Sequence, residues 1–187
     1  PDDLSSTWVY DTFDSYAGGG VIGQNSGQGW DASWANALSG TNFVVQDAVT
    51  YKSTSQALKI DCATITGESA VSRTFSTKTF ALFTIYMQRG VGEKHHQSTL
   101  FLGPEGTNLM HVYLSNALNG SQIMWAYGNG SGGVVEEALE PYTVDTWYKL
   151  QLEVDALQDQ YRVRVNEGGW TSWQNFIANR TSAGITT

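Results

Sequence analysis

The chain has 187 residues, a formal net charge of −8, 20 glycines and only 15% charged residues. Its length suits a single domain, 1–187, that buries a core without help from a disulfide or a metal. The acidic balance excludes general nucleic-acid binding and disfavours anionic membranes, because both need a basic surface. With 12% aromatic residues, the composition is typical of a β-rich, loop-rich protein. We therefore expect an extracellular protein, or one displayed on a cell or virion surface.

The first third of the chain alternates short strands with long polar loops. Residues 1–7 are polar and predict a flexible tail or a leading strand, and a strand is expected at 8–13. The glycine-rich stretch 14–29 predicts a loop. Trp30 and Trp34 follow, and we expect them to plug the end of a sandwich. Further strands are predicted at 42–46, 57–63 and 70–75.

The middle of the chain is richer in apolar residues. The run 80–88 is almost entirely apolar and predicts a central strand with both faces partly covered. His95 and His96 fall in a polar loop and are expected to face solvent. Cys62, the single cysteine, excludes an intrachain disulfide and is expected to be a small buried residue. Strands are predicted at 99–102, 109–114, 122–127 and 134–139.

The clearest pattern is a hairpin formed by residues 147–155 and 161–166. Apolar and polar side chains alternate in both runs, so each strand has one apolar and one polar face. Trp170 and Trp173 come after it and are expected in the core or at an end of the sandwich. In all, ten to twelve short strands without a helix predict an all-β fold. No run approaches the ~20 apolar residues that a membrane-spanning helix needs.

Three groups of residues resemble the concanavalin A-like (laminin-G-like) jelly-roll superfamily. They are 10–16 with Gly29 and Trp30, then 53–60, then the hairpin of 147–155 and 161–166. The resemblance implies a jelly-roll β-sandwich of two antiparallel sheets and a lectin-like role. Members often close with a strand beside the first, but this chain stops at 183–187. We therefore expect a short edge strand, or a homo-oligomer or neighbouring chain that adds a strand.

Glu153, Asp155 and Gln158 resemble the Glu-x-Asp-x-x-Glu signature of jelly-roll glycoside hydrolases. That chemistry needs a second carboxylic acid as proton donor, and Gln158 cannot donate a proton at neutral pH. The favoured interpretation is a charge-paired outer face, neutralised across the hairpin by Arg162 and Arg164. A diverged or inactive hydrolase is the alternative.

Aromatic residues supply the candidate ligand site. Trp125 and Tyr127 project to one side of a strand, and flat aromatic rings shield the apolar faces of sugars. Tyr86, on another strand, is a further candidate. The alternative is that these rings fill the core. His111 and Tyr113 share a face of their strand, which predicts a polar sheet face, a sugar contact or the base of a polysaccharide lyase.

The resemblance also implies a structural calcium ion that clips the first strand to a neighbouring loop. Asp14 is the first candidate ligand and Asp11 the second, with plain turn-capping as the alternative. Asn119, Asn129 and Asn179 begin glycosylation sequons by pattern, although Asn-Gly also suits tight turns.

We therefore expect a non-catalytic lectin-like or carbohydrate-binding module. One alternative is a structural surface protein, such as a virion decoration, fibre or filament subunit that self-associates. A second is a diverged glycoside hydrolase or polysaccharide lyase. Carbohydrate is the expected partner, with no nucleic acid and no membrane insertion.

Overall fold

The computed structural model describes residues 11, 13–38, 43–46, 57–60, 70–76, 78–90, 97–102, 108–115 and 120–177. The secondary structure is almost entirely β, which confirms the all-β prediction. Within these ranges no helix is long and apolar enough to cross a membrane. The predictions made for Cys62, His95, His96, Asn119, Asn179 and the closing strand at 183–187 lie outside the described residues, as does most of the strand expected at 8–13.

The chain divides into two compact units, Pro1–Ser76 and Thr77–Thr187. In the first, two small antiparallel sheets are described, with strand orders β1-β3-β4 and β2-β5. Tyr16 and Val21 form its buried cluster, against which Phe13 and Trp34 pack. The strands are β1 (Gly19–Gly20), β2 (Ala35–Leu38), β3 (Phe43–Gln46), β4 (Ala57–Ile60) and β5 (Ala70–Ser72).

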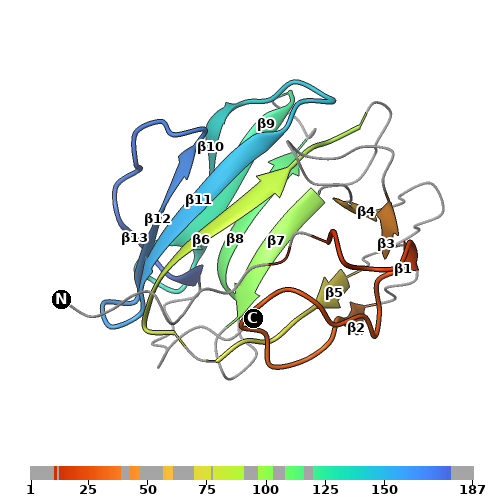
Figure 1. Ribbon diagram of the computed structural model, residues 1–187. Coiled ribbons are helices and arrows are strands. Elements are labelled where there is room, and N and C mark those ends of the chain that lie inside the picture. Colours follow the sequence, from red (N-terminus) through yellow and green to blue (C-terminus); the bar gives the residue numbers. More distant parts are fainter. Residues whose placement is uncertain are drawn as a thin grey trace. The chain divides into compact units, whose positions relative to one another are not determined.

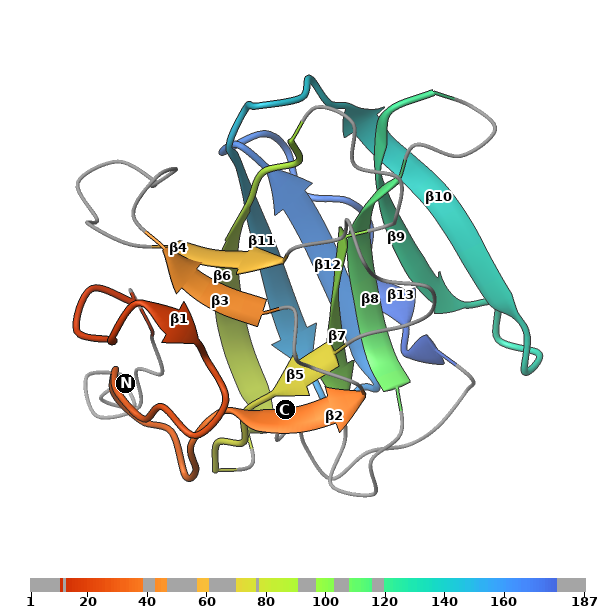
Figure 2. The same cartoon turned by 90° about the vertical axis from the view of Figure 1, so that its right-hand side faces the viewer.

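The second unit is one strongly curled antiparallel sheet (Figures 1 and 2). Its hydrogen-bonded order is β6-β11-β12-β13-β9-β8-β7, and β10 pairs with β9. The strands are β6 (Phe80–Met87), β7 (Gln97–Leu102), β8 (Asn108–Ser115), β9 (Gln122–Gly128), β10 (Val134–Pro141), β11 (Tyr148–Asp155), β12 (Gln160–Val165) and β13 (Gln174–Asn175).

Within the described part of the sheet, the apolar strand β6 lies at one end and not at the centre, where the run 80–88 predicted it. Among the described strands it pairs only with β11, so it lies at one end of the hydrogen-bonded order. Its side chains alternate in exposure: Phe80 and Leu82 are 58% and 54% exposed, while Met87 is buried. The run therefore carries apolar residues on a face that the described residues do not cover. An unbroken apolar run alone does not distinguish this case from a strand buried on both faces.

The predicted hairpin forms β11 and β12, and its alternation is confirmed. The register places Leu152 opposite Val163 and Val154 opposite Tyr161, and all four side chains are fully buried. Burying each aliphatic side chain contributes about 1.5–3 kcal/mol. Glu153 and Arg162 lie opposite each other on the other face.

Tyr161 links β12 to β9 across the core. Its ring meets the Trp125 ring edge-on at 5.5 Å, and its hydroxyl donates a hydrogen bond to the Ala126 carbonyl. Burial raises the pKa of Tyr161, because the phenolate form loses its hydration. The Phe176 ring packs on the Tyr161 ring, with 6.4 Å between their centroids. These contacts join β9, β12 and the residue that follows β13.

Candidate functional site

A return segment, residues 166–173, leads the chain back along β12. Asn166 and Glu167 adopt left-handed conformations (φ 48° and 63°), and the Gly168 N–H donates to the Val165 carbonyl at 2.8 Å. Thr171 then bonds to Val163 twice, through its N–H at 2.9 Å and its hydroxyl oxygen at 3.0 Å. The segment is thus held to the strand by main-chain as well as side-chain bonds.

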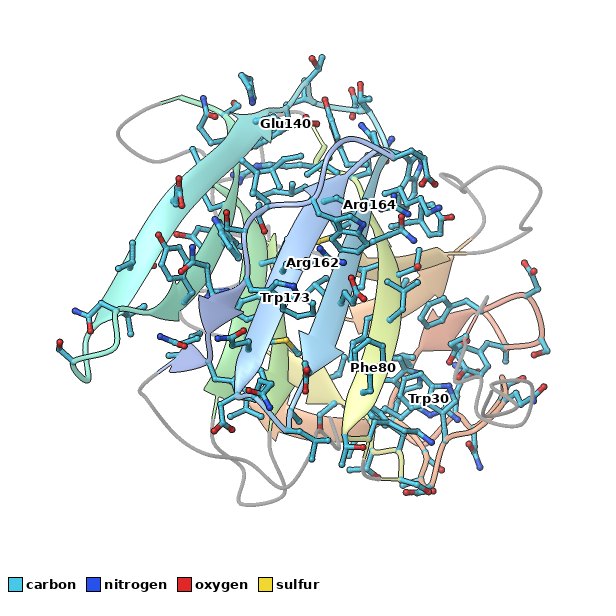
Figure 3. All side chains as sticks on the ribbon, turned by 90° about the vertical axis from the view of Figure 1, so that its left-hand side faces the viewer. Trp30, Phe80, Glu140, Arg162, Arg164 and Trp173 are labelled. Atoms are coloured by element: carbon cyan, nitrogen blue, oxygen red, sulfur yellow. The ribbon has the colours of Figure 1, made fainter. Side chains whose placement is uncertain are left out.

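Two arginines of β12 and two tryptophans of the return segment form an alternating stack. The Arg162 guanidinium lies 4.7 Å from the Trp173 ring and 4.9 Å from the Trp170 ring, and Arg164 lies 4.7 Å from Trp170. Figure 3 shows the two arginines along β12 with Trp173 beside Arg162. Both indoles are half-buried on the polar face of the hairpin. The prediction that they sit in the core or plug an end was wrong, because arginine side chains give them a stacking surface.

Hydrogen bonds fix the arginines of this stack. The Arg162 Nε donates to the Glu153 carboxylate at 2.7 Å, and the Arg164 Nε donates to the Oε1 of the Gln151 side chain at 2.8 Å. Glu167 pairs with Arg164 at 3.1 Å. Charge pairing across the hairpin is therefore confirmed for Glu153. Asp155 has a local role, since its Oδ1 accepts the N–H groups of two turn residues, Leu157 and Gln158.

A first cavity of about 330 Å³ has β10 on one side and the return segment on the other. The register of β9 and β10 places Glu137 opposite Trp125, so both side chains point to the same face. An aromatic ring, a carboxylate, two hydroxyls and an amide are thus brought together. The lining residues are Trp125, Glu137, Ala138, Leu139, Thr171, Ser172 and Gln174.

Of the two leading sequence candidates, Trp125 lines this cavity and Tyr127 does not, although it contacts two of the lining residues. Their rings are 4.8 Å apart, and the Tyr127 hydroxyl donates to Glu137 at 3.1 Å. The pKa of Tyr127 is raised by burial and then by the neighbouring Glu137 carboxylate. Trp125 is only 2% exposed, so it lines the cavity as a packed wall and not as an open platform. Its indole N–H is buried and has no acceptor among the described residues.

His111 and Tyr113 belong to the opposite face of the sheet. Val112 pairs with Trp125, which turns the neighbouring side chains of β8 away from the first cavity. The two rings stack at 4.6 Å. Burial, followed by the charge of Glu136 and a hydrogen bond to it, raises the pKa of Tyr113 to about 12. Tyr86 is half-buried on β6, and three strands separate β6 from β9 in the sheet order.

A second cavity of about 210 Å³ adjoins the first, and both are lined by Leu139 and Thr171. It adds a carboxylate, a guanidinium and an indole to the group of side chains around the return segment. Its remaining lining residues are Glu140, Val163, Arg164, Val165, Gly168, Gly169 and Trp170. Sequence reasoning missed Glu137, Ser172 and Gln174, because only the pairing of β9 with β10 and the path of the return segment bring them to Trp125.

The two calcium candidates differ in environment. The Asp11 carboxylate accepts bonds from Arg73 at 2.6 Å, from the Phe13 N–H at 2.9 Å and from the Tyr16 hydroxyl. A guanidinium already occupies this carboxylate, so the arrangement does not fit a calcium ion there. Asp14 is exposed. Across the ranges that the structure describes, no group of three or more His, Cys, Asp or Glu side chains could hold a metal ion.

Comparisons with protein-family models, with curated proteins and with solved structures gave no match to this chain.

Proposed function

We propose that this protein is a non-catalytic carbohydrate-binding module whose site is the first cavity. The observation that carries the proposal is its lining, which joins the Trp125 ring to the Glu137 carboxylate, the Ser172 hydroxyl and the Gln174 amide. Sugars present apolar ring faces and hydroxyl groups that donate and accept, and this combination matches both. The volume, about 330 Å³, is at the lower end of ligand sites.

The charges around the cavity favour a neutral sugar. Glu137 lines the first cavity and Glu140 lines the second. A uronic acid or sulfated sugar would bring a like charge against these carboxylates. A neutral sugar instead offers hydroxyl groups that donate strong hydrogen bonds to a carboxylate. A hydroxyl in the cavity also offers an acceptor for the buried indole N–H of Trp125.

The scaffold that we propose is a jelly-roll sandwich in which the curled sheet supplies both layers. The packing of Tyr161 from β12 on Trp125 from β9 supports this. Binding without turnover is supported by Glu153, which is paired to Arg162, and by Gln158, which replaces the third carboxylate of the hydrolase signature. We place the protein outside the cell or on a cell or virion surface, where glycans are displayed.

A glycan array carrying neutral and acidic oligosaccharides tests this function. We expect binding to neutral glycans, and a loss of about tenfold in affinity for Glu137→Gln, which corresponds to one charge-assisted hydrogen bond. Glu136→Gln is the matched control, because it removes the same charge from the other face of β10. Release of reducing ends or unsaturated sugars on incubation would contradict binding without turnover. An array without hits, or hits unaffected by Glu137→Gln, would contradict the site.

The exposed apolar face of β6, and its place at the end of the described strand order, favour a second candidate function, self-association as a structural subunit. Among the described strands this eight-residue strand pairs only with β11, and Phe80 and Leu82 are exposed. Such an edge accepts a strand from a second copy of the chain. Sedimentation velocity over a range of concentrations should then show dimers that Leu82→Lys abolishes. A monomer at every concentration would exclude this candidate.

A further inference from the structure

We infer that the two cavities act together as adjoining subsites for one glycan chain of at least two sugar rings. This deepens the proposed function and rests on it. The cavities meet at Leu139 and Thr171, which line both. A ligand that fills the first cavity therefore reaches the second without crossing a wall of other residues.

The same two structural elements line both cavities in the same order. On β10 the lining runs from Glu137, in the first cavity, to Glu140, in the second. A bulge between Ala138 and Glu140 places Glu137 and Glu140 opposite residues only two apart on β9, so this stretch covers about 7 Å, which is longer than one sugar ring. On the other side the return segment contributes Ser172 to the first cavity and Gly169 to the second. The walls thus run side by side over a length suited to an oligosaccharide.

The side chains of the second cavity suit another sugar ring. Glu140 and Arg164 provide an acceptor and donors, and Trp170 provides an aromatic surface. Arg164 shares the Glu167 carboxylate with Lys149, and Glu140 supplies a second carboxylate in the lining, so the lining itself has no excess positive charge that would select an acid. It therefore extends the preference of the first cavity for neutral rings.

The border that the two cavities share is held by hydrogen bonds and stacking before any sugar binds. Thr171, which lines both, is bonded twice to Val163. Trp170 is held against Arg162 and Arg164 by the stack. A preorganised site loses little side-chain and loop entropy on binding. The second sugar ring is also covalently linked to the first. Its contacts therefore add to affinity without a second loss of translational freedom.

Gly169 offers a substitution that blocks the second cavity alone. It lines that cavity and not the first, and a Cβ built on it meets no atom within 4 Å. Its φ lies outside the left-handed region, so other residues adopt the same backbone conformation without strain. Gly169→Phe should therefore fold and fill space in the second cavity. Gly169→Ala, which adds only a methyl group, is the matched control.

Calorimetry with glucose, mannose and galactose, and with the β1,4-linked di- and trisaccharides of each, tests the inference. For the sugar series that binds, we expect the trisaccharide to bind the native protein at least tenfold more tightly than the monosaccharide. Gly169→Phe should remove this gain and leave monosaccharide affinity unchanged. The indole N–H resonance of Trp170 should shift with the trisaccharide and not with the monosaccharide, a readout that needs no variant.

Equal affinity for mono- and trisaccharide, a gain that survives Gly169→Phe, or an unmoved Trp170 resonance would each overturn the two-subsite inference and leave the proposed function standing. Absence of binding by every sugar in the set, at every length, would overturn both.

Discussion

At the scale of single residues, the first unit is held by a buried ion pair. The side chains of Arg73 and Asp11 are 1% and 5% exposed, and their charged atoms lie 2.6 Å apart. The Arg73 guanidinium also donates to the Tyr16 hydroxyl at 2.7 Å and to the Ala32 carbonyl at 2.9 Å. In such a pair, removing one partner is costly because it leaves the other charge buried without a counter-ion.

Asp11→Ala should therefore destabilise the protein by about 3–5 kcal/mol, because it leaves the Arg73 charge buried without its counter-ion. Asp14→Ala, at an exposed position, should change stability by less than about 0.5 kcal/mol. Urea denaturation measures both. If Asp11 held calcium instead, a chelator would destabilise the native protein and erase the difference from Asp11→Ala. We expect the difference to be the same with and without the chelator.

Tyr113 makes stability depend on alkaline pH. Its pKa is about 12 in the folded protein, raised from 10 by burial and by Glu136. Because the unfolded chain loses this proton first, the contribution is complete below pH 10 and is lost as the pH rises towards 12. Tyr113→Phe should flatten the fall in unfolding free energy over this interval. An unchanged slope in urea denaturation between pH 9 and pH 11.5 would contradict the assignment.

At the scale of elements, the return segment gives the site its shape. Its two tryptophans stack on the arginines of β12, and residues 171 and 172 between them line the first cavity. Each cation–π contact contributes about 0.5–2 kcal/mol. The stack thus couples the polar face of the hairpin to the wall of the site.

Trp173→Leu should lose one ring of the stack and about 1–2 kcal/mol of stability. It should also weaken glycan binding several-fold, because Thr171 and Ser172 are less firmly placed. Trp173 lines neither cavity, so a change in affinity reports on the wall and not on a lost sugar contact. Leu157→Ala, at a 76% exposed turn position, is the control and should affect neither quantity. Native affinity in a destabilised Trp173→Leu protein would show that the stack supports only the fold.

The sequence predicted these elements unevenly. The hairpin of β11 and β12 was readable because side chains alternate with a period of two, and the period sets the buried face. The return segment was not readable in the same way. Trp170 and Trp173 resemble core residues by type, and their arginine partners become visible only when the chain folds back along β12. Trp125 was recognised as a candidate, but Glu137 meets it only through the register of β9 and β10.

At the scale of the whole molecule, composition and strand patterns were sufficient to predict an all-β chain. They could not place β6 at an end of the sheet order, because pairing partners far apart in the chain decide which strand is central. They also gave no size or position for the cavities. Those depend on how far the sheet curls and on the side chains that fill its inner face, and neither has a local signal in the sequence.

The central claim, a neutral glycan in the first cavity, is tested most directly by following the indole N–H resonance of Trp125 during a trisaccharide titration. The resonance is assigned by its absence in Trp125→Phe. We predict a saturable shift with the same dissociation constant that calorimetry gives, and a weakened response in Glu137→Gln. Calorimetric binding with an unmoved Trp125 resonance would place the sugar elsewhere and contradict the account.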